Sequence, residues 1–89
     1  MKVANDVKYF AIVRSGDSPE HPSGLARRTM TPTGRLDETL RRDLTWMRDS
    51  AIYEWERGEE MGADLVEISE ADANQVIQDF RHEWGAQQD

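Results

Sequence analysis

The chain contains no cysteine among its 89 residues. This absence excludes a disulfide framework and any metal site built from thiolates, and it fits a reducing compartment. No apolar run approaches the roughly eighteen residues that would span a bilayer. The N-terminal sequence MKVANDVKYF also lacks the apolar core of a signal peptide. We therefore expect a cytoplasmic protein with no membrane association.

Motifs of established chemistry are missing as well. Neither of the two histidines, His21 and His82, has a serine or cysteine nucleophile at a characteristic spacing, and Ser18 stands in GDSP rather than in G-x-S-x-G. No glycine-rich phosphate loop follows a strand. Asp17, Glu20 and His21 lack the spacing of a calcium loop or a helical zinc motif. The sequence therefore predicts no catalytic residue, no metal ligand and no cofactor.

Charge is abundant and unevenly distributed. The net charge is −7, yet residues 1–48 hold nine Lys or Arg against six acids, a balance of +3, whereas residues 49–89 hold two Arg against twelve acids, a balance of −10. The overall acidity disfavours nucleic-acid binding, which depends on neutralising phosphates. The asymmetry leaves room for a basic face or for contacts between oppositely charged parts of two subunits.

Three segments have the composition of β-strands. Residues 7–14, VKYFAIVR, combine aromatic and β-branched residues, residues 25–31 follow a Pro- and Gly-containing loop at 15–24, and residues 64–68 have the sequence DLVEI. We expect the first two strands to pair antiparallel across the loop.

Two segments have the periodicity of amphipathic helices. The first extends from Leu36 to about Gly58, and its apolar stripe contains Leu36, Leu40, Leu44, Met47, Ala51 and Trp55. The second begins at Ser69, which has an acid three residues later as in a capping box, and should end at Gly85. Its apolar stripe contains Ala73, Val76, Ile77, Phe80 and Trp84.

This order of elements predicts one α+β domain over residues 1–89, with a frayed tail at 86–89. We expect a three-stranded, mainly antiparallel sheet with two helices on one face, in the order strand, strand, helix, strand, helix. The first strand is apolar on both sides, so one apolar face stays uncovered. We assign Phe10 and Ile12 to self-association in a homodimer. Face-to-face and edge-to-edge pairing of two sheets would both remove the exposed surface.

Aromatic residues mark a second surface. Trp46 and Tyr53 are seven residues apart on the predicted long helix, about 130–150° from its buried stripe, and Arg42 precedes Trp46 by one turn. Because Trp, Tyr and Arg are enriched at binding hot spots, these three residues form the predicted site for a protein partner. Alternatively, another segment such as the 15–24 loop covers the rings, or the rings line a small-molecule pocket.

Arginines concentrate in one third of the chain. Arg27, Arg28 and Arg35 are candidate anion-binding residues, because guanidinium groups bind phosphates and carboxylates through paired hydrogen bonds. A salt-bridged surface, or pairing with the acidic half of a neighbouring subunit, explains the same concentration.

The segments YFAIVR, SGLARR, RRDLTW, EWERGE and LVEISEADA resemble those of short uncharacterised α+β proteins that are common in actinobacterial genomes. The resemblance covers most of the chain. It implies a stand-alone cytoplasmic protein and transfers no functional residue.

The sequence therefore favours a non-enzymatic protein-binding or assembly module that forms a homodimer. A nucleic-acid-associated regulator that uses Arg27, Arg28, Arg35 and Arg42 is the second hypothesis. The third is a small enzyme or ligand-binding domain with a pocket between two subunits.

Overall fold

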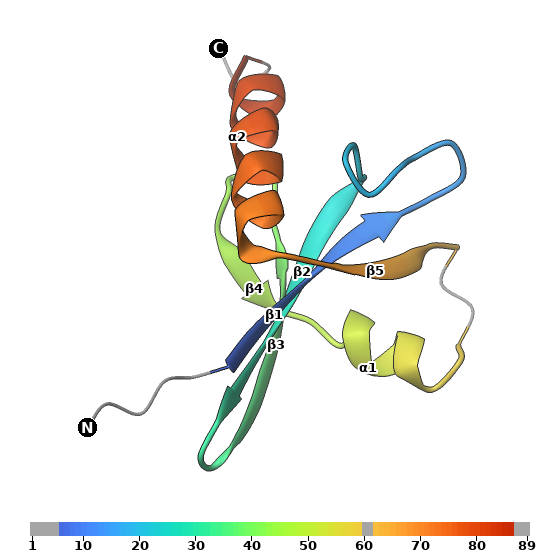
Figure 1. Ribbon diagram of the computed structural model, residues 1–89, viewed down its shortest axis with the longest axis vertical. Helices are drawn as coiled ribbons and strands as arrows, with labels where there is room; N and C mark the ends of the chain where they lie inside the picture. Colours follow the sequence, from blue (N-terminus) through green and yellow to red (C-terminus); the bar gives the residue numbers. More distant parts are fainter. Residues whose placement is uncertain (1–5, 60–61, 87–89) are drawn as a thin grey trace.

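The computed structural model describes residues 6–59 and 62–86. Its elements are β1 (Asp6–Val13), β2 (Gly24–Thr31), β3 (Gly34–Leu40), β4 (Trp46–Arg48), α1 (Ala51–Glu56), β5 (Asp64–Ile68) and α2 (Glu70–Ala86). The strands form one antiparallel sheet in the order β4-β3-β2-β1-β5 (Figure 1). The α+β class is confirmed, but the sheet has five strands rather than three. Neither helix is long and apolar enough to cross a membrane.

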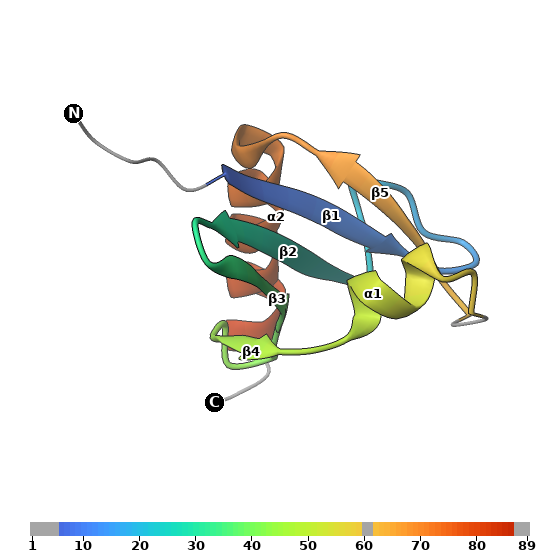
Figure 2. The same ribbon diagram turned by 90° about the horizontal axis from the view of Figure 1, so that it is seen from below.

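The two helices lie on opposite faces of the sheet (Figure 2). Adjacent residues of β2 point to opposite faces, and they belong to different core clusters. Leu25 packs with Val76 and Phe80 of α2, whereas Ala26 packs with Ile52 of α1. The expectation that both helices cover one face is therefore wrong. The segment between β4 and β5 supplies only a short helix, and it lies on the face opposite α2.

The C-terminal helix is the element that the sequence describes best. Its predicted stripe is buried at four of five positions, Ala73, Val76, Phe80 and Trp84. The rings of Phe80 and Trp84 stack with their centroids 4.1 Å apart. Ser69 Oγ accepts a hydrogen bond from the Asp72 backbone N–H at 3.0 Å, so the predicted N-cap is confirmed.

Residues 36–58 form two strands and one short helix instead of the predicted single helix. Leu36 and Leu40 share one face of β3, because a spacing of four residues is even and therefore repeats on a strand as well as on a helix. Met47 lies in β4 and is half exposed. Only Ala51–Glu56 keeps the helical conformation that the apolar spacing predicts.

A tight turn between β3 and β4 explains why the helix does not form. Leu44 has a left-handed backbone with a φ of 67°, which no α-helix accommodates. Asp43 Oδ1 accepts hydrogen bonds from the backbone N–H and from the hydroxyl of Thr45, at 3.1 and 2.6 Å. These bonds lower the pKa of the Asp43 carboxyl. Short polar side chains often stabilise turns in this way, and the turn sends the chain back along β3.

Opposite charges face each other across the β2–β3 hairpin. The strand register pairs Arg27 with Glu38 and Arg28 with Asp37, and the nitrogen–oxygen distance is 2.8 Å in both pairs. The two pairs lie on opposite faces of the sheet, since neighbouring side chains alternate. Opposite charges at facing positions stabilise a sheet by roughly 0.2–1 kcal/mol per pair, so these pairs favour the observed register.

Arg28 also attaches α1 to the sheet. Its two terminal nitrogens donate hydrogen bonds to the carboxylate of Glu56 at 2.8 and 3.0 Å, while its Nε and Nη2 bond Asp37 at 2.8 and 3.0 Å. The side chains of Arg28 and Asp37 are each only 11% exposed. The bond from Arg28 holds the pKa of the Glu56 carboxyl below its usual range, and the two carboxylates raise the pKa of Arg28. The carboxylate of Glu56 therefore stays ionised, and the attachment intact, at neutral pH.

Candidate protein-interaction surface

β5 forms one edge of the sheet and is paired with β1 alone. Within residues 6–59 and 62–86, no segment pairs with its outer side (Figure 2). Its sequence DLVEI has no proline and no lysine, two residues that natural proteins use to prevent pairing at exposed edges. The two acids point to opposite faces of the sheet. The backbone at the outer edge is therefore open to another strand.

The register with β1 defines which backbone groups of β5 point outward. The Ile12 carbonyl accepts a hydrogen bond from Ser23 N–H at 2.9 Å, so it points toward β2. Backbone groups alternate in direction along an antiparallel strand, and Ala11 therefore points toward β5, where its partner is Val66. Val66 bonds to β1. The N–H and C=O groups of the residues on either side of Val66 point to the open edge.

The side chains of β5 alternate between the two faces. Leu65 is 4% exposed and packs with Ile52 of α1. Val66 lies on the α2 face and is 37% exposed, and Glu67 is exposed on the α1 face. The strand is thus anchored by a buried leucine, while a partly exposed valine stands at the free edge.

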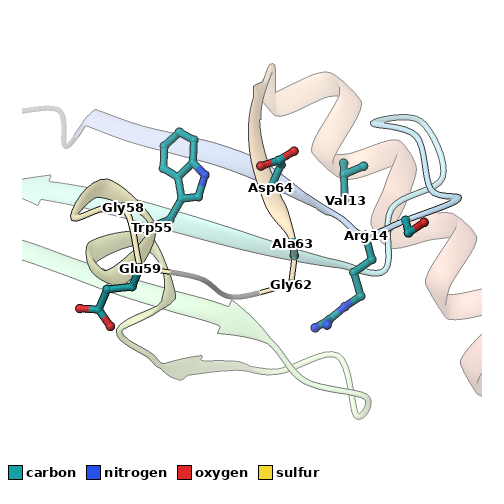
Figure 3. Close-up of a pocket in the computed structure, with 9 residues that line it drawn as sticks. Val13, Arg14, Trp55, Gly58, Glu59, Gly62, Ala63 and Asp64 are labelled. Atoms are coloured by element: carbon teal, nitrogen blue, oxygen red, sulfur yellow. The ribbon is translucent and has the colours of Figure 1, made fainter.

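An open groove of about 510 Å³ lies at the start of β5 (Figure 3). Its lining brings together Trp55 of α1, Arg14 after β1, and the carboxylates of Glu59 and Asp64. Trp55 is 37% exposed, although the helical periodicity placed it in a buried stripe. These side chains offer apolar contact and charged hydrogen bonds, and the lining holds no histidine.

The three residues predicted to bind a partner do not share one helix face. Arg42 lies in the turn after β3, Trp46 in β4 and Tyr53 in α1. Trp46 packs against the α2-side core, with the guanidinium of Arg27 4.1 Å from its ring centroid and the Tyr9 ring 6.3 Å away. The prediction of a single long helix, on which this site depended, is wrong. Partner binding by any one of the three residues stays a prediction.

Arg42 and Tyr53 lie on opposite sides of the sheet. The guanidinium of Arg42 lies 5.2 Å from the ring centroid of Trp84 in α2. Two guanidinium groups lie near the ring of Tyr53, those of Arg35 at 5.6 Å and Arg57 at 5.4 Å from its centroid. Arg57 also donates a hydrogen bond to the Tyr53 hydroxyl at 3.2 Å, and the tyrosine is 42% exposed.

The candidate anion-binding arginines do not converge either. Arg27 and Arg28 point to opposite faces, and each is already bound to a carboxylate. Arg35 is 43% exposed and lies 4.0 Å from the carboxylate of Asp37. Anion binding by these residues stays a prediction. Among residues 6–59 and 62–86, no three His, Cys, Asp or Glu side chains are placed to hold a metal ion.

Phe10 and Ile12, predicted to mediate self-association, lie on the face that α1 covers. Both are half-buried against the cluster formed by Ala26, Ile52 and Leu65. The premise that this whole face lacks a helix is wrong, so the apolar surface available there is smaller than expected. Self-association through these two residues stays a prediction.

Local sequence patterns did not identify the open edge of β5 or the exposure of Trp55. The edge follows from the order of the strands, which brings β5 beside β1 although some fifty residues separate them. Comparisons of the chain with protein-family models, with curated proteins and with solved structures find no match. The resemblance to short actinobacterial proteins stays a prediction.

Proposed function

We propose that this chain is a non-enzymatic protein-binding module that accepts a β-strand at the outer edge of β5. The observation that carries the proposal is the open backbone of this strand, where Leu65 and Glu67 direct their N–H and C=O groups away from the sheet. Strand addition at an exposed edge is a recurring mode of recognition, in which main-chain hydrogen bonds provide affinity and alternate side chains provide specificity.

The setting of β5 supports this proposal. The strand is paired with β1 over all five residues and anchored by the buried Leu65, so its outer groups are held in an extended conformation before a partner arrives. Such preorganisation lowers the entropic cost of binding. A helix packs on each face of the sheet, which leaves the edge as the more accessible surface. The cytoplasmic location and the homodimer expected from the sequence belong to the same proposal.

Replacing Glu67 with proline should block the edge with little damage to the sheet. The Glu67 N–H points outward, so proline removes a donor offered to a partner while the hydrogen bonds to β1 remain. We expect peptides selected from a displayed library of extended sequences to bind the Glu67→Pro variant at least about fivefold more weakly than the unmodified protein, because the lost hydrogen bond contributes about 1 kcal/mol.

The matched control is Glu67→Thr, which removes the same carboxylate but keeps the N–H and a strand-favouring side chain. Peptides that use the edge should bind this variant within a factor of about three of the unmodified protein. Equal binding to the proline variant and the unmodified protein would show that the edge is not the docking site.

A further inference from the structure

We propose that the strand accepted by β5 is the β5 strand of a second copy of this chain, so that two sheets join edge to edge. This inference rests on the proposed function, because it names the occupant of the same edge. It follows from the hydrogen-bonding pattern and the residue order of the strand, which together make β5 complementary to itself.

A two-fold axis beside Val66 provides this complementarity. In an antiparallel pair around that axis, Val66 faces Val66 of the second copy, Leu65 faces Glu67, and Asp64 faces Ile68. Leu65 and Glu67 are the residues whose N–H and C=O groups point outward. Each of the two Leu65–Glu67 pairs can therefore exchange two backbone hydrogen bonds, as directly opposed residues do in an antiparallel ladder.

The neighbouring two-fold registers are poorer. An axis beside Glu67 places two glutamates directly opposite each other, and like charges at facing positions are destabilising. An axis beside Leu65 pairs only three of the five β5 residues within the strand and sets Val66 against Asp64. A register shifted by one residue would set backbone groups that point outward opposite backbone groups that point toward β1. It would also place facing side chains on opposite faces of the joined sheet. Only the axis beside Val66 pairs the whole strand without opposing like charges.

The exposed side chains agree with this register. Val66 is 37% exposed on the α2 face, and in the dimer two valines meet at a non-hydrogen-bonded position, where facing side chains approach most closely. Leu65 stays beneath α1. Glu67 lies on the solvent-exposed side of the α1 face, so its carboxylate remains hydrated after pairing.

The acidic charge of this edge gives self-association a different salt dependence from the binding of a basic peptide. Asp64, Glu67 and Glu70 make the edge acidic, so two copies repel each other at low ionic strength. Salt screens this repulsion, with a Debye length of about 30 Å at 0.01 M and about 3 Å at 1 M. Self-association should therefore strengthen as salt is added, whereas docking of a basic peptide on the same edge should weaken.

The test is sedimentation equilibrium of the full chain up to about 1 mM at low and high salt. Because the paired strands are short and the interface is small, we expect a weak, reversible dimer. Addition of salt should tighten it. Glu67→Pro should weaken it at least about tenfold, whereas Glu67→Gln keeps the N–H, removes one charge, and should dimerise at least as well as the unmodified chain.

Val66→Lys provides a second variant in case the proline variant fails to fold. The position is already partly exposed, so the lysine is tolerated in the monomer, but two lysines would oppose each other at the axis. We expect this variant to be monomeric and Val66→Thr to dimerise.

A chain that stays monomeric at about 1 mM in high salt, or a dimer insensitive to both Glu67→Pro and Val66→Lys, overturns the inference. If the chain is monomeric but selected peptides lose binding to Glu67→Pro, the inference that a second copy occupies the edge is wrong and the proposed function stands. If those peptides bind Glu67→Pro unchanged, the proposal that the β5 edge is the docking site is wrong as well.

Discussion

Replacement of Arg28 with alanine is expected to lower the free energy of unfolding by about 3 kcal/mol, because it breaks a largely buried charge network. The guanidinium makes four hydrogen bonds, two to Asp37 and two to Glu56. Without it the carboxylate of Asp37, only 11% exposed, loses its main partner, and α1 loses its link to the sheet. The change is measured by urea denaturation followed by far-UV circular dichroism.

Arg35→Ala is the matched control for this substitution. Arg35 approaches the same carboxylate of Asp37, but at 4.0 Å and with 43% of its side chain exposed, and exposed ion pairs contribute at most about 1 kcal/mol. We expect its replacement to cost less than about 1 kcal/mol. An Arg28→Ala variant as stable as the Arg35→Ala variant would contradict the role given to Arg28.

Replacement of Phe80 with alanine should have a still larger effect. The ring is 5% exposed, stacks on Trp84, and belongs to the cluster that joins α2 to Leu25 of β2. Truncation of a buried phenylalanine costs about 3–5 kcal/mol. A domain of this size has little stability to spare, so we expect a chain that is largely unfolded at 25 °C.

The loss should appear as reduced far-UV ellipticity and a weaker near-UV signal from the stacked rings. Gln78→Ala, at an exposed position of the same helix, should leave the unfolding transition within about 0.5 kcal/mol of that of the unmodified protein. A cooperative transition for Phe80→Ala within about 1 kcal/mol of the unmodified protein would show that α2 is not held by this cluster.

The elements that the sequence predicted correctly are those in which one periodicity dominates. In α2, apolar residues follow the helical repeat, and Ser69 supplies the N-cap. In β1, the aromatic and β-branched residues favour a strand over a helix. The pattern of α2 also identifies buried side chains, such as Val76 and Phe80, whereas in β1 Ala11 alone is buried and Val7 is 40% exposed.

The segment 36–58 was mispredicted because its leucine spacing satisfies both periodicities. Its sequence nevertheless contains a signal for the observed hairpin. The arginines at 27 and 28 and the acids at 37 and 38 lie symmetrically about the Pro- and Gly-containing turn, so folding at that turn sets opposite charges face to face on both sides of the ribbon. The opposite charges placed symmetrically about the turn indicate the observed hairpin, whereas the helical spacing of the leucines indicates a helix that does not form.

The candidate docking site was not predictable from local patterns. The DLVEI segment was predicted as a strand, and it is one. Its position at the rim of the sheet results from non-local pairing with β1, while β2, β3 and β4 extend the sheet on the other side. The expectation of self-association arose from an uncovered sheet face, and the structure points instead to an uncovered edge.

The central claim is that the outer edge of β5 is open and accepts a strand, and amide hydrogen exchange tests it most directly. In dilute solution at low salt, the amides of Leu65 and Glu67 should exchange much faster than that of Val66, whose N–H bonds to β1. High protein concentration with added salt, or an edge-binding peptide, should slow both fast amides while Val66 changes little. Amides of Leu65 and Glu67 that are already protected in dilute solution, or that stay unprotected when a second copy or a peptide binds, would contradict the account.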